Sequence, residues 1–411
     1  MRVLWLATSP SLYKEEKVMG WIGSLEHVFR TYCPDIDLGI TFEYNDSNFK
    51  VEKNGVTYYP IAIQPKLKDR LQMKFNGNDN WYLKKPLLLK VIEDFKPDII
   101  QCFGSEWNWG LIAEETDIPV VLHMQGFINI YADCDAKVQR YPRSFCYKAS
   151  HPHETLQRIF GKSYSKKRNE NERKIMRSVH YFMGRTEWDK DIVKYFSPGA
   201  KYYHCAEAIR PAIYDSKEKW SYSQSDTIKI VTIASAGNLK GNNIILETAR
   251  ILKRMGVNFT WRVSGDKRII AAFERITGIR ASDVNVEPLG YINVDQVKQE
   301  LLNTEIFVLP SIIDNSPNSL CEAQLIGTPV IASYVGGIPQ MVENGKTGIL
   351  YPHNEPYTLA FKILELHGSP DTLKQLSANE IDMSHKRHDP QKLATRIKEI
   401  YADVINSHDK N

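Results

Sequence analysis

Short apolar runs alternate with longer amphipathic stretches along the first half of the chain. The runs lie at 3–7, 98–103 and 119–124, and the segment that begins at Trp21 has apolar residues at helical spacing. Strands that are buried on both faces form continuous apolar runs, and the helices between them make the crossover connections of a parallel sheet. The pattern predicts an α/β domain.

A second alternation follows a polar segment. The segment 215–227, DSKEKWSYSQSDT, has little that could be buried, so we expect an interdomain linker there. Apolar runs then recur, beginning with IKIVTIA at 228–234. The sequence therefore predicts an N-terminal domain over 1–214, a C-terminal domain over 228–389, and a helix at about 390–411 that packs back on the first domain.

Length and composition agree with two domains of an ordinary folded protein. A chain of 411 residues is too long for one core. The net charge of +4 is too small to indicate nucleic acid, and none is expected as a partner. The six cysteines form no C-x-x-C pair, and the N-terminal apolar run is too short for a signal peptide. We therefore expect a cytoplasmic protein without disulfides.

The segment 311–333, SIIDNSPNSLCEAQLIGTPVIAS, has the signals of a short helix between two apolar runs. Ser316 is a suitable N-cap, and Pro317 suits the first helical position because its missing N–H would have no intrahelical partner. Gly327 marks the end of the helix. The helix is thus expected to begin at the carboxyl end of a strand.

The start of this helix is a candidate anion site. The free amides of Asn318, Ser319 and Leu320, together with the helix dipole, suit a phosphate group. Glu322 lies one turn further on the same face, where its carboxylate can accept hydrogen bonds from the two hydroxyls of a ribose. The segment therefore indicates a nucleotide site. A strand, turn and helix with a solvated glutamate remains an equal alternative on spacing alone.

The same segment resembles the signature of family 4 retaining glycosyltransferases. In that family two acidic residues eight apart form an E-x7-E motif, and here the pair is Asp314 and Glu322. YVGGIPQMVENGKTGILYP at 334–352 resembles the family's G-G-x-P-E segment and the N-G-x-x-G turn after it. In the N-terminal half, GWIGSLE at 20–26 and GRTEWD at 184–189 resemble a bacterial subgroup that acts in surface polysaccharide synthesis.

The resemblance implies a GT-B fold, in which two Rossmann-like domains have parallel sheets that face a central cleft. It also implies transfer of a sugar, with retention, from a nucleotide diphosphate sugar to a glycan or lipid-linked acceptor, without a metal or other cofactor. Two alternatives remain open. One is a nucleotide-sugar 2-epimerase on the same fold, and the other is a non-catalytic subunit that binds a nucleotide sugar.

Roles carried over from the family fall on four places in the C-terminal half. Glu322 would bind the ribose, and the amides of 318–320 would bind the diphosphate. Asp314 would lie near the donor sugar, although it stands where the family usually has glutamate. Lys240, in NLKG, would stabilise the leaving diphosphate as charge builds in the transition state.

The remaining carried-over roles include one departure from the family. The arginine expected five residues before the lysine is Ser235, so Arg185 and Arg268 are candidate replacements for its charge. Gly20, after the first strand, would let the backbone approach the donor phosphates. His123 is placed like the family's histidine near the transferred sugar.

Two weaker patterns lie between the first domain's motifs. Asp133 and Asp135 form a D-x-D pair, which is a metal motif of a different glycosyltransferase fold and is common by chance. The segment 137–177 holds twelve lysines or arginines against three acids, with aromatic residues interleaved. This segment is either a solvated face or a contact with anionic lipid headgroups or a lipid-linked acceptor, which would make the protein peripheral on the inner membrane face.

Overall fold

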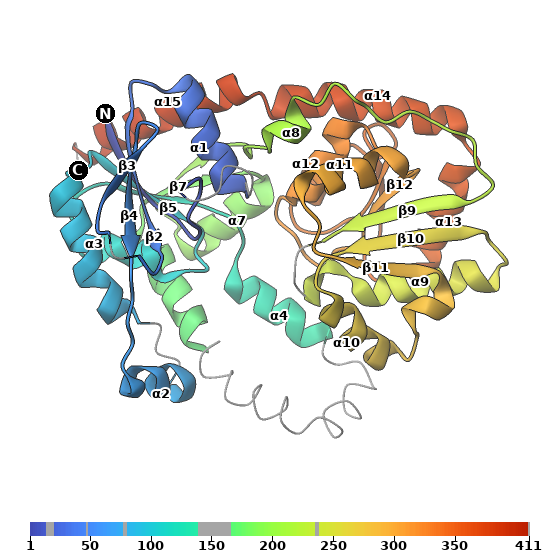
Figure 1. Cartoon of the computed structure of the whole chain (residues 1–411), viewed down its shortest axis with the longest axis horizontal. Coiled ribbons are helices and arrows are strands. Elements are labelled where there is room, and N and C mark those ends of the chain that lie inside the picture. The colour runs from blue at the N-terminus through green and yellow to red at the C-terminus, as the bar shows by residue number, and fades with distance from the viewer. Residues whose placement is uncertain (14–19, 47, 77–79, 139–165, 235–237, 410–411) are drawn as a thin grey trace. The chain divides into compact units, whose positions relative to one another are not determined.

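The computed structural model divides the protein into two compact units (Figure 1). Unit 1 comprises Met1–Ile130, His151–Ala208 and Asp389–Asn411, and unit 2 comprises Tyr131–Ser150 and Ile209–His388. The structure describes every residue except 14–19, 47, 77–79, 139–165, 235–237 and 410–411.

Unit 1 is built, over its described residues, on an eight-stranded sheet of order β3-β4-β2-β1-β5-β6-β7-β8. Its strands are β1 (Arg2–Leu6), β2 (Asp37–Glu43), β3 (Val51–Lys53), β4 (Val56–Ile61), β5 (Ile99–Phe103), β6 (Val120–His123), β7 (Tyr181–Gly184) and β8 (Lys201–His204). Among these strands, only the edge strand β3 pairs antiparallel with its neighbour, β4.

Both faces of this sheet are covered. Successive side chains of a strand point to opposite faces, so Val3 and Trp5 join one core while Leu4 and Leu6 join the other. The helices are α1 (Trp21–Tyr32), α2 (Leu67–Asn76), α3 (Trp81–Phe95), a helix over 166–178, α7 (Glu187–Phe196) and α15 (Pro390–His408). Helix α4 (Ile128–Val138) begins in this unit, but its residues from Tyr131 on group with unit 2.

The helix expected at about 390–411 is α15, and it lies against α1 within unit 1 (Figure 1). Its buried residues recur at helical spacing and join the core that contains Trp5. The apolar stripe therefore explains why the C-terminal segment returns to the first unit.

Unit 2 contains a six-stranded parallel sheet of order β11-β10-β9-β12-β13-β14 within its described residues. The strands are β9 (Ile228–Ile233), β10 (Phe259–Ser264), β11 (Val286–Gly290), β12 (Ile306–Leu309), β13 (Val330–Ser333) and β14 (Ile349–Tyr351). The helices are α8 (Pro211–Tyr214), α9 (Asn242–Arg254), α10 (Lys267–Thr277), α11 (Val294–Asn303), α12 (Asn318–Ile326), α13 (Pro356–His367) and α14 (Pro370–Arg387).

Helices cover both faces of this sheet as well. In Figure 1, α9 and α10 lie together on one face, and α11 and α12 lie on the other. Two such sheets, parallel throughout in unit 2 and parallel except at β3 in unit 1, confirm the predicted α/β class.

The segment 215–227 is not a bare linker, contrary to the prediction. It groups with unit 2, and Trp220 is buried in that unit's core. The Trp220 amide donates to the Ile326 carbonyl at 2.9 Å, and its indole N–H donates to the Thr304 carbonyl at 2.7 Å. One large aromatic residue therefore fixes a segment whose composition is otherwise polar.

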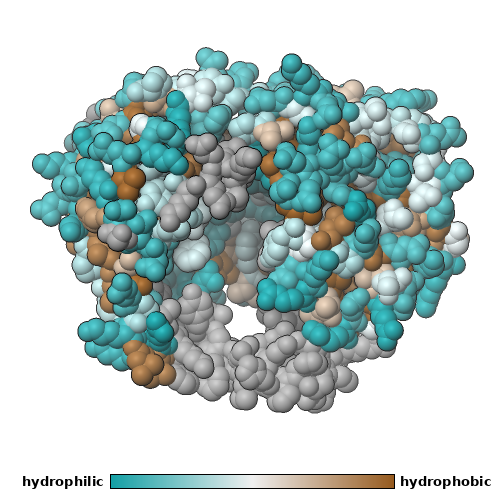
Figure 2. All heavy atoms as spheres, viewed as in Figure 1, coloured by the Kyte–Doolittle hydropathy of each residue, from teal (hydrophilic) through white to brown (hydrophobic). Residues whose placement is uncertain are grey.

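The surface seen in Figure 2 is mostly hydrophilic. A hydrophobic spot at the lower left lies over α2, which carries the exposed side chains of Leu67 and Leu71. Among the described residues, no helix combines the length and the apolar character needed to cross a membrane.

Candidate functional site

Two loops of unit 2 meet beyond the carboxyl ends of β9 and β12. The Ile312 amide donates to the Leu239 carbonyl at 2.8 Å. Gly241 has a φ of 73°, and a Cβ there would lie 1.8 Å from the Pro310 carbonyl oxygen. Only glycine allows this approach, so the glycine of NLKG brings the two loops together.

This contact places Lys240 beside Asp314. The Lys240 ammonium lies 2.5 Å from Asp314 Oδ2, and the Ser311 hydroxyl donates to the same oxygen at 3.1 Å. Gly336 and Gly337, the G-G pair of the next motif, contact the backbone of Asp314. Gly337 donates its amide to the Asp314 carbonyl at 3.0 Å, and a Cβ at Gly336 (φ 53°) would lie 1.9 Å from that oxygen.

Helix α12 begins one residue later than the sequence predicted. Pro317 is the N-cap, with an extended ψ of 118°, and no side chain caps the helix. Ser316 is therefore not the N-cap, because Pro317 already supplies the extended residue before the first turn. The buried Ser316 Oγ and Asn318 Oδ1 have no hydrogen-bond partner within the described structure. A polar ligand at this position would satisfy them.

One of the three predicted amides is already used. The Leu320 amide donates to the Pro317 carbonyl at 3.0 Å, so it is not free for a phosphate. Asn318 and Ser319 lie in the first turn, ahead of any intrahelical acceptor for their amides. Of the three predicted amides, those of Asn318 and Ser319 therefore remain candidates for binding an anion.

Glu322 is 5% exposed and paired with a residue that the sequence analysis did not identify. Arg210, just before α8, donates from Nε to Oε1 at 2.7 Å and from Nη2 to Oε2 at 2.6 Å. Burial raises the pKa of Glu322, and the Arg210 charge opposes this shift. Each carboxylate oxygen keeps a further lone pair, so the ion pair orients Glu322 without using its whole acceptor capacity.

Arg268 does not replace the charge of the arginine that was expected at the position of Ser235. That side chain is 89% exposed and pairs with Asp266, the N-cap of α10, at 2.5 Å. Ser235 lies outside the described residues. The cation that the structure places next to Asp314 is Lys240.

In unit 1, His123 occupies the carboxyl end of β6 and is 1% exposed. Its Nδ1 lies 3.3 Å from Gln101 Nε2, and Nε2 is buried with no hydrogen-bond partner among the described residues. Trp21 packs edge-on against the imidazole, with ring centroids 5.0 Å apart. Arg185 lies over the Trp21 ring at 4.4 Å. Burial, and then the Arg185 charge, lower the pKa of His123 to about 3.

Gly20 is exposed and is the N-cap of α1. A Cβ at Gly20 would have no atom of the described residues within 4 Å. Its φ of −74° is open to any residue, so the backbone does not require glycine here.

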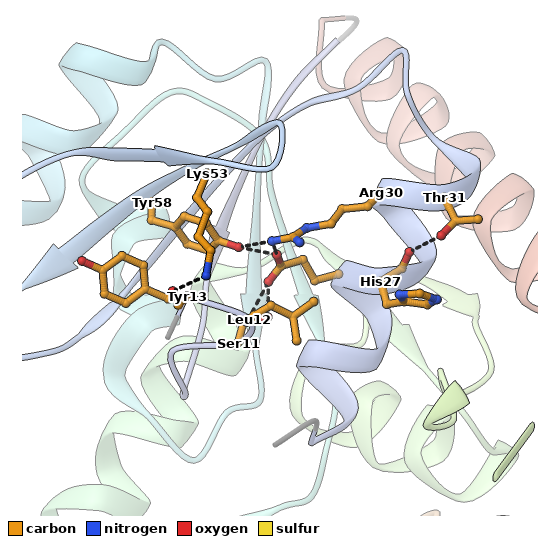
Figure 3. Close-up of polar contacts among 9 residues, drawn as sticks. Ser11, Leu12, Tyr13, His27, Arg30, Thr31, Lys53 and Tyr58 are labelled. Atoms are coloured by element: carbon orange, nitrogen blue, oxygen red, sulfur yellow. Dashed lines mark hydrogen bonds and ion pairs between the residues drawn. The ribbon is translucent and has the colours of Figure 1, made fainter. Parts of the chain in front are cut away.

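The loop after β1 is anchored by a buried carboxylate, Glu26 of α1. The residues that bind it, Ser11, Leu12, Arg30 and Tyr58, are labelled in Figure 3. Glu26 Oε2 accepts from the Ser11 hydroxyl at 2.5 Å and from the Leu12 amide at 3.0 Å. Its other oxygen meets the Tyr58 hydroxyl and the Arg30 guanidinium. Four partners fully satisfy this buried charge, so Glu26 fixes the loop to the helix that Gly20 begins.

The two weaker sequence patterns lie partly outside the described residues. Asp133 is exposed on α4, and nothing is described of the Asp135 side chain. Most of the basic segment 137–177 also lies outside the described residues, although its last part forms the helix over 166–178.

Comparison with solved structures identifies the fold. Sucrose-phosphate synthase from Thermosynechococcus elongatus has a TM-score of 0.76 at 13% identity, and the match covers 99% of each chain. Anabaena Alr3699/HepE in complex with UDP-glucose has a TM-score of 0.65 at 16% identity, covering 98% of this chain and 100% of that one. The protein has the GT-B fold of these structures.

Sequence comparison matches part of the chain to a family model. Residues 227–369 match the model described as glycosyl transferases group 1, in agreement with the resemblance that the motifs indicated. WcaL of Salmonella typhimurium, a glycosyltransferase assigned to colanic acid biosynthesis, is 32% identical over 148 residues, which are 34% of this chain and 36% of the relative. The amylovoran biosynthesis glycosyltransferase AmsK of Erwinia amylovora is 27% identical over 187 residues, 44% of this chain and 45% of the relative. Each match spans less than half of the relative's length.

Proposed function

We propose that this protein is a retaining glycosyltransferase that moves a sugar from a nucleoside diphosphate sugar to a glycan or lipid-linked acceptor in bacterial surface polysaccharide synthesis. The observation that carries the proposal is the Lys240–Asp314 pair beside the uncapped start of α12. Relatives with matching C-terminal regions are named for colanic acid and amylovoran biosynthesis, which supports the polysaccharide class.

Each part of the unit 2 site suits one part of the donor. The amides of Asn318 and Ser319 and the positive end of the helix dipole suit the diphosphate. Lys240 supplies a positive charge. Its stabilising effect increases as the sugar's bond to the diphosphate breaks, because negative charge then builds on the diphosphate. Asp314 holds that ammonium in place and lies where a donor sugar hydroxyl could be bound. Glu322, oriented by Arg210, suits the ribose hydroxyls.

We also propose that three residues of unit 1 contact the bound donor. No atom of the described residues lies within 4 Å of a Cβ at Gly20, which suits close approach of a phosphate to the backbone. His123 offers a buried ring nitrogen to the transferred sugar, and Arg185 contributes positive charge near it. With an ammonium and a helix start to meet the diphosphate, the reaction needs no metal ion.

Uridine nucleotides are the first donors to test. The structures of Anabaena Alr3699/HepE contain UDP, and one contains UDP-glucose. Thermal unfolding should be followed with UDP-, GDP- and other nucleotide sugars, because a ligand at 100 times its dissociation constant adds about 2.7 kcal/mol of stability. The same screen with Lys240→Ala tests whether the site binds the donor. Lys374→Ala is the matched control, because Lys374 pairs with Asp371 on the surface of α14.

Product analysis then separates the alternatives. Sugar transfer that requires an added acceptor supports the proposal. A changed sugar without an acceptor would show a 2-epimerase instead, and donor binding without turnover would show a binding subunit. If none of the nucleotide sugars raised the unfolding temperature, the proposal would be wrong.

We further propose that the protein is cytoplasmic and contacts the inner membrane face through 137–177. The twelve basic residues of this segment support attraction to anionic headgroups. Liposome sedimentation tests it, with anionic and neutral vesicles at low and high salt. Binding should be confined to anionic vesicles and should weaken with salt. Changing Lys166, Lys167 and Arg168 to Gln should reduce it, whereas equal binding to both vesicle types would contradict the contact.

A further inference from the structure

A buried chain of hydrogen bonds connects α15 to His123 within unit 1. The Trp5 indole N–H donates to the Tyr401 hydroxyl at 3.1 Å. Tyr401 in turn donates to Gln101 Oε1, and Gln101 Nε2 lies 3.3 Å from His123 Nδ1. All four side chains are buried. The chain thus links β1, α15, β5 and β6.

Elementary hydrogen-bond chemistry gives this chain one direction. An indole N–H can only donate, so the Tyr401 oxygen is the acceptor and its own hydrogen needs another acceptor. Gln101 provides that acceptor with its carbonyl oxygen, because leaving the hydroxyl hydrogen unpaired in the core would cost about 1–3 kcal/mol. The amide nitrogen of Gln101 then faces the imidazole. The Trp5 indole therefore fixes which end of the Gln101 side-chain amide faces His123.

The chain also determines which ring nitrogen of His123 carries the proton. The Gln101 amide nitrogen can only donate, so Nδ1 must receive this bond through its lone pair. The ring proton of the neutral imidazole is consequently on Nε2, the nitrogen with no partner among the described residues.

The surroundings of His123 favour the neutral ring and hold its plane. Burial and the Arg185 charge lower the pKa of His123, while Glu207 opposes them weakly. Phe103 stacks on the ring at a centroid distance of 6.0 Å, and Trp21 packs on it edge-on. A neutral N–H donor held in this way cannot remove a proton from an acceptor hydroxyl.

We propose that Trp5, Tyr401 and Gln101 are positioning residues that hold His123 as a fixed Nε2–H donor toward an uncharged oxygen, a hydroxyl of the transferred sugar. The identity of that ligand rests on the proposed function. The tautomer rests only on the chain of hydrogen bonds. His123 then orients the sugar and takes no part as a base.

Nitrogen NMR of the full-length protein tests the tautomer directly. Two-bond proton–nitrogen correlation spectra distinguish Nε2–H from Nδ1–H rings, and the His123→Gln variant identifies the His123 signals among the eleven histidines. We expect the Nε2–H pattern for wild type at neutral pH. An Nδ1–H ring or a charged ring in wild type would overturn the proposal without any assay of activity.

Variants test whether the hydrogen bonds from Trp5 through Tyr401 and Gln101 set the tautomer of His123. Gln101→Glu places an acceptor opposite Nδ1, so the proton should move to Nδ1 or the ring should become charged. Tyr401→Phe frees the Gln101 amide, and a mixture of tautomers is expected. Tyr203→Phe is the matched control, because Tyr203 also donates to α15, through Asp403 at 2.8 Å, but does not touch the chain. An unchanged tautomer in Gln101→Glu would overturn the proposal.

Kinetics then separate this proposal from the proposed function. With an active donor, Tyr401→Phe should lower kcat up to about tenfold, the value of one neutral hydrogen bond, and Tyr203→Phe should not. Gln101→Glu should add a pH dependence that wild type lacks. If the NMR results hold but no nucleotide sugar binds, the proposed function fails while the positioning of His123 stands. If a donor is turned over and Tyr401→Phe has the same kcat as the control, His123 is not positioned for that sugar.

Discussion

The two candidate sites satisfy their buried polar groups in different ways. In unit 2 the groups are charged and paired, Lys240 with Asp314 and Arg210 with Glu322. In unit 1 the histidine is neutral and receives its only described hydrogen bond from an amide, Gln101. A charged ligand such as a diphosphate can rearrange ion pairs, whereas a neutral fixed donor suits a hydroxyl.

This difference predicts how each site responds to mutation. Removing one member of a buried ion pair leaves an uncompensated charge, which costs far more than losing a neutral hydrogen bond. Unit 2 should therefore show large effects on stability and turnover, and unit 1 should show smaller effects on orientation.

The largest effect is expected for Arg210→Ala, which leaves the buried Glu322 carboxylate without its partner. The free energy of unfolding should fall by about 3–5 kcal/mol, measured by urea denaturation at neutral pH. Arg262→Ala is the control, because Arg262 also meets a glutamate, Glu300, but is 43% exposed. Its loss should be about 0–1 kcal/mol. Equal losses would show that Glu322 is not effectively buried.

The same variant should respond to pH in a defined direction. Burial raises the folded-state pKa of Glu322, and the variant lacks the Arg210 charge that opposes this. As the pH falls through the raised value, the folded state binds a proton before the unfolded state does. The deficit of Arg210→Ala should therefore be largest at neutral pH and shrink under mildly acidic conditions. A deficit that grew on acidification would contradict this assignment.

Lys240→Ala should have the next largest effect, and on turnover more than on donor affinity. The charge that Lys240 meets grows as the sugar's bond to the diphosphate breaks, so kcat should fall about 10²–10³-fold, as for loss of a transition-state donor. Steady-state kinetics and calorimetry measure the two quantities, with Lys374→Ala as control. Normal turnover in Lys240→Ala would assign the leaving-group role to another cation.

A smaller effect is expected for the ribose contact of Glu322. Glu322→Ala should weaken nucleotide binding by roughly 1.5–3 kcal/mol, the value of hydrogen bonds to a charged group. Calorimetry with UDP and 2′-deoxy-UDP isolates the contact, since wild type should prefer the ribonucleotide and the variant should not. Glu300→Gln, which changes the partner of the more exposed Arg262, is the control. A ribose preference that survives in Glu322→Ala would remove this role.

Local patterns predicted what depends on local sequence. Apolar runs and helical spacing predicted the parallel sheets, and the helix signals located α12 to within one residue. The motif spacing identified Asp314 and Glu322 as candidate site residues. The partner of Glu322 could not be predicted, because Arg210 lies 112 residues before it and no local pattern marks it.

Three further features were not predicted from the sequence, each for a physical reason. Trp220 made a polar segment part of the unit 2 core, which an average over composition cannot show. The Leu320 amide turned back to the Pro317 carbonyl, a detail set by how the first turn closes. The tautomer of His123 depends on Tyr401, 300 residues from Gln101 in the chain, so only the folded structure reveals it.

The smallest effect on stability is expected for Gly20→Ala in unit 1. The added methyl would meet no atom of the described residues within 4 Å, and the φ of −74° suits alanine. The free energy of unfolding should change by less than about 0.5 kcal/mol. Gly336→Ala in unit 2 is the contrast, since its Cβ would lie 1.9 Å from the Asp314 carbonyl oxygen at a φ of 53°. If Gly20 lies under the donor phosphates, Gly20→Ala should still weaken donor binding in calorimetry. A variant with wild-type stability and wild-type donor affinity would show that no phosphate approaches Gly20.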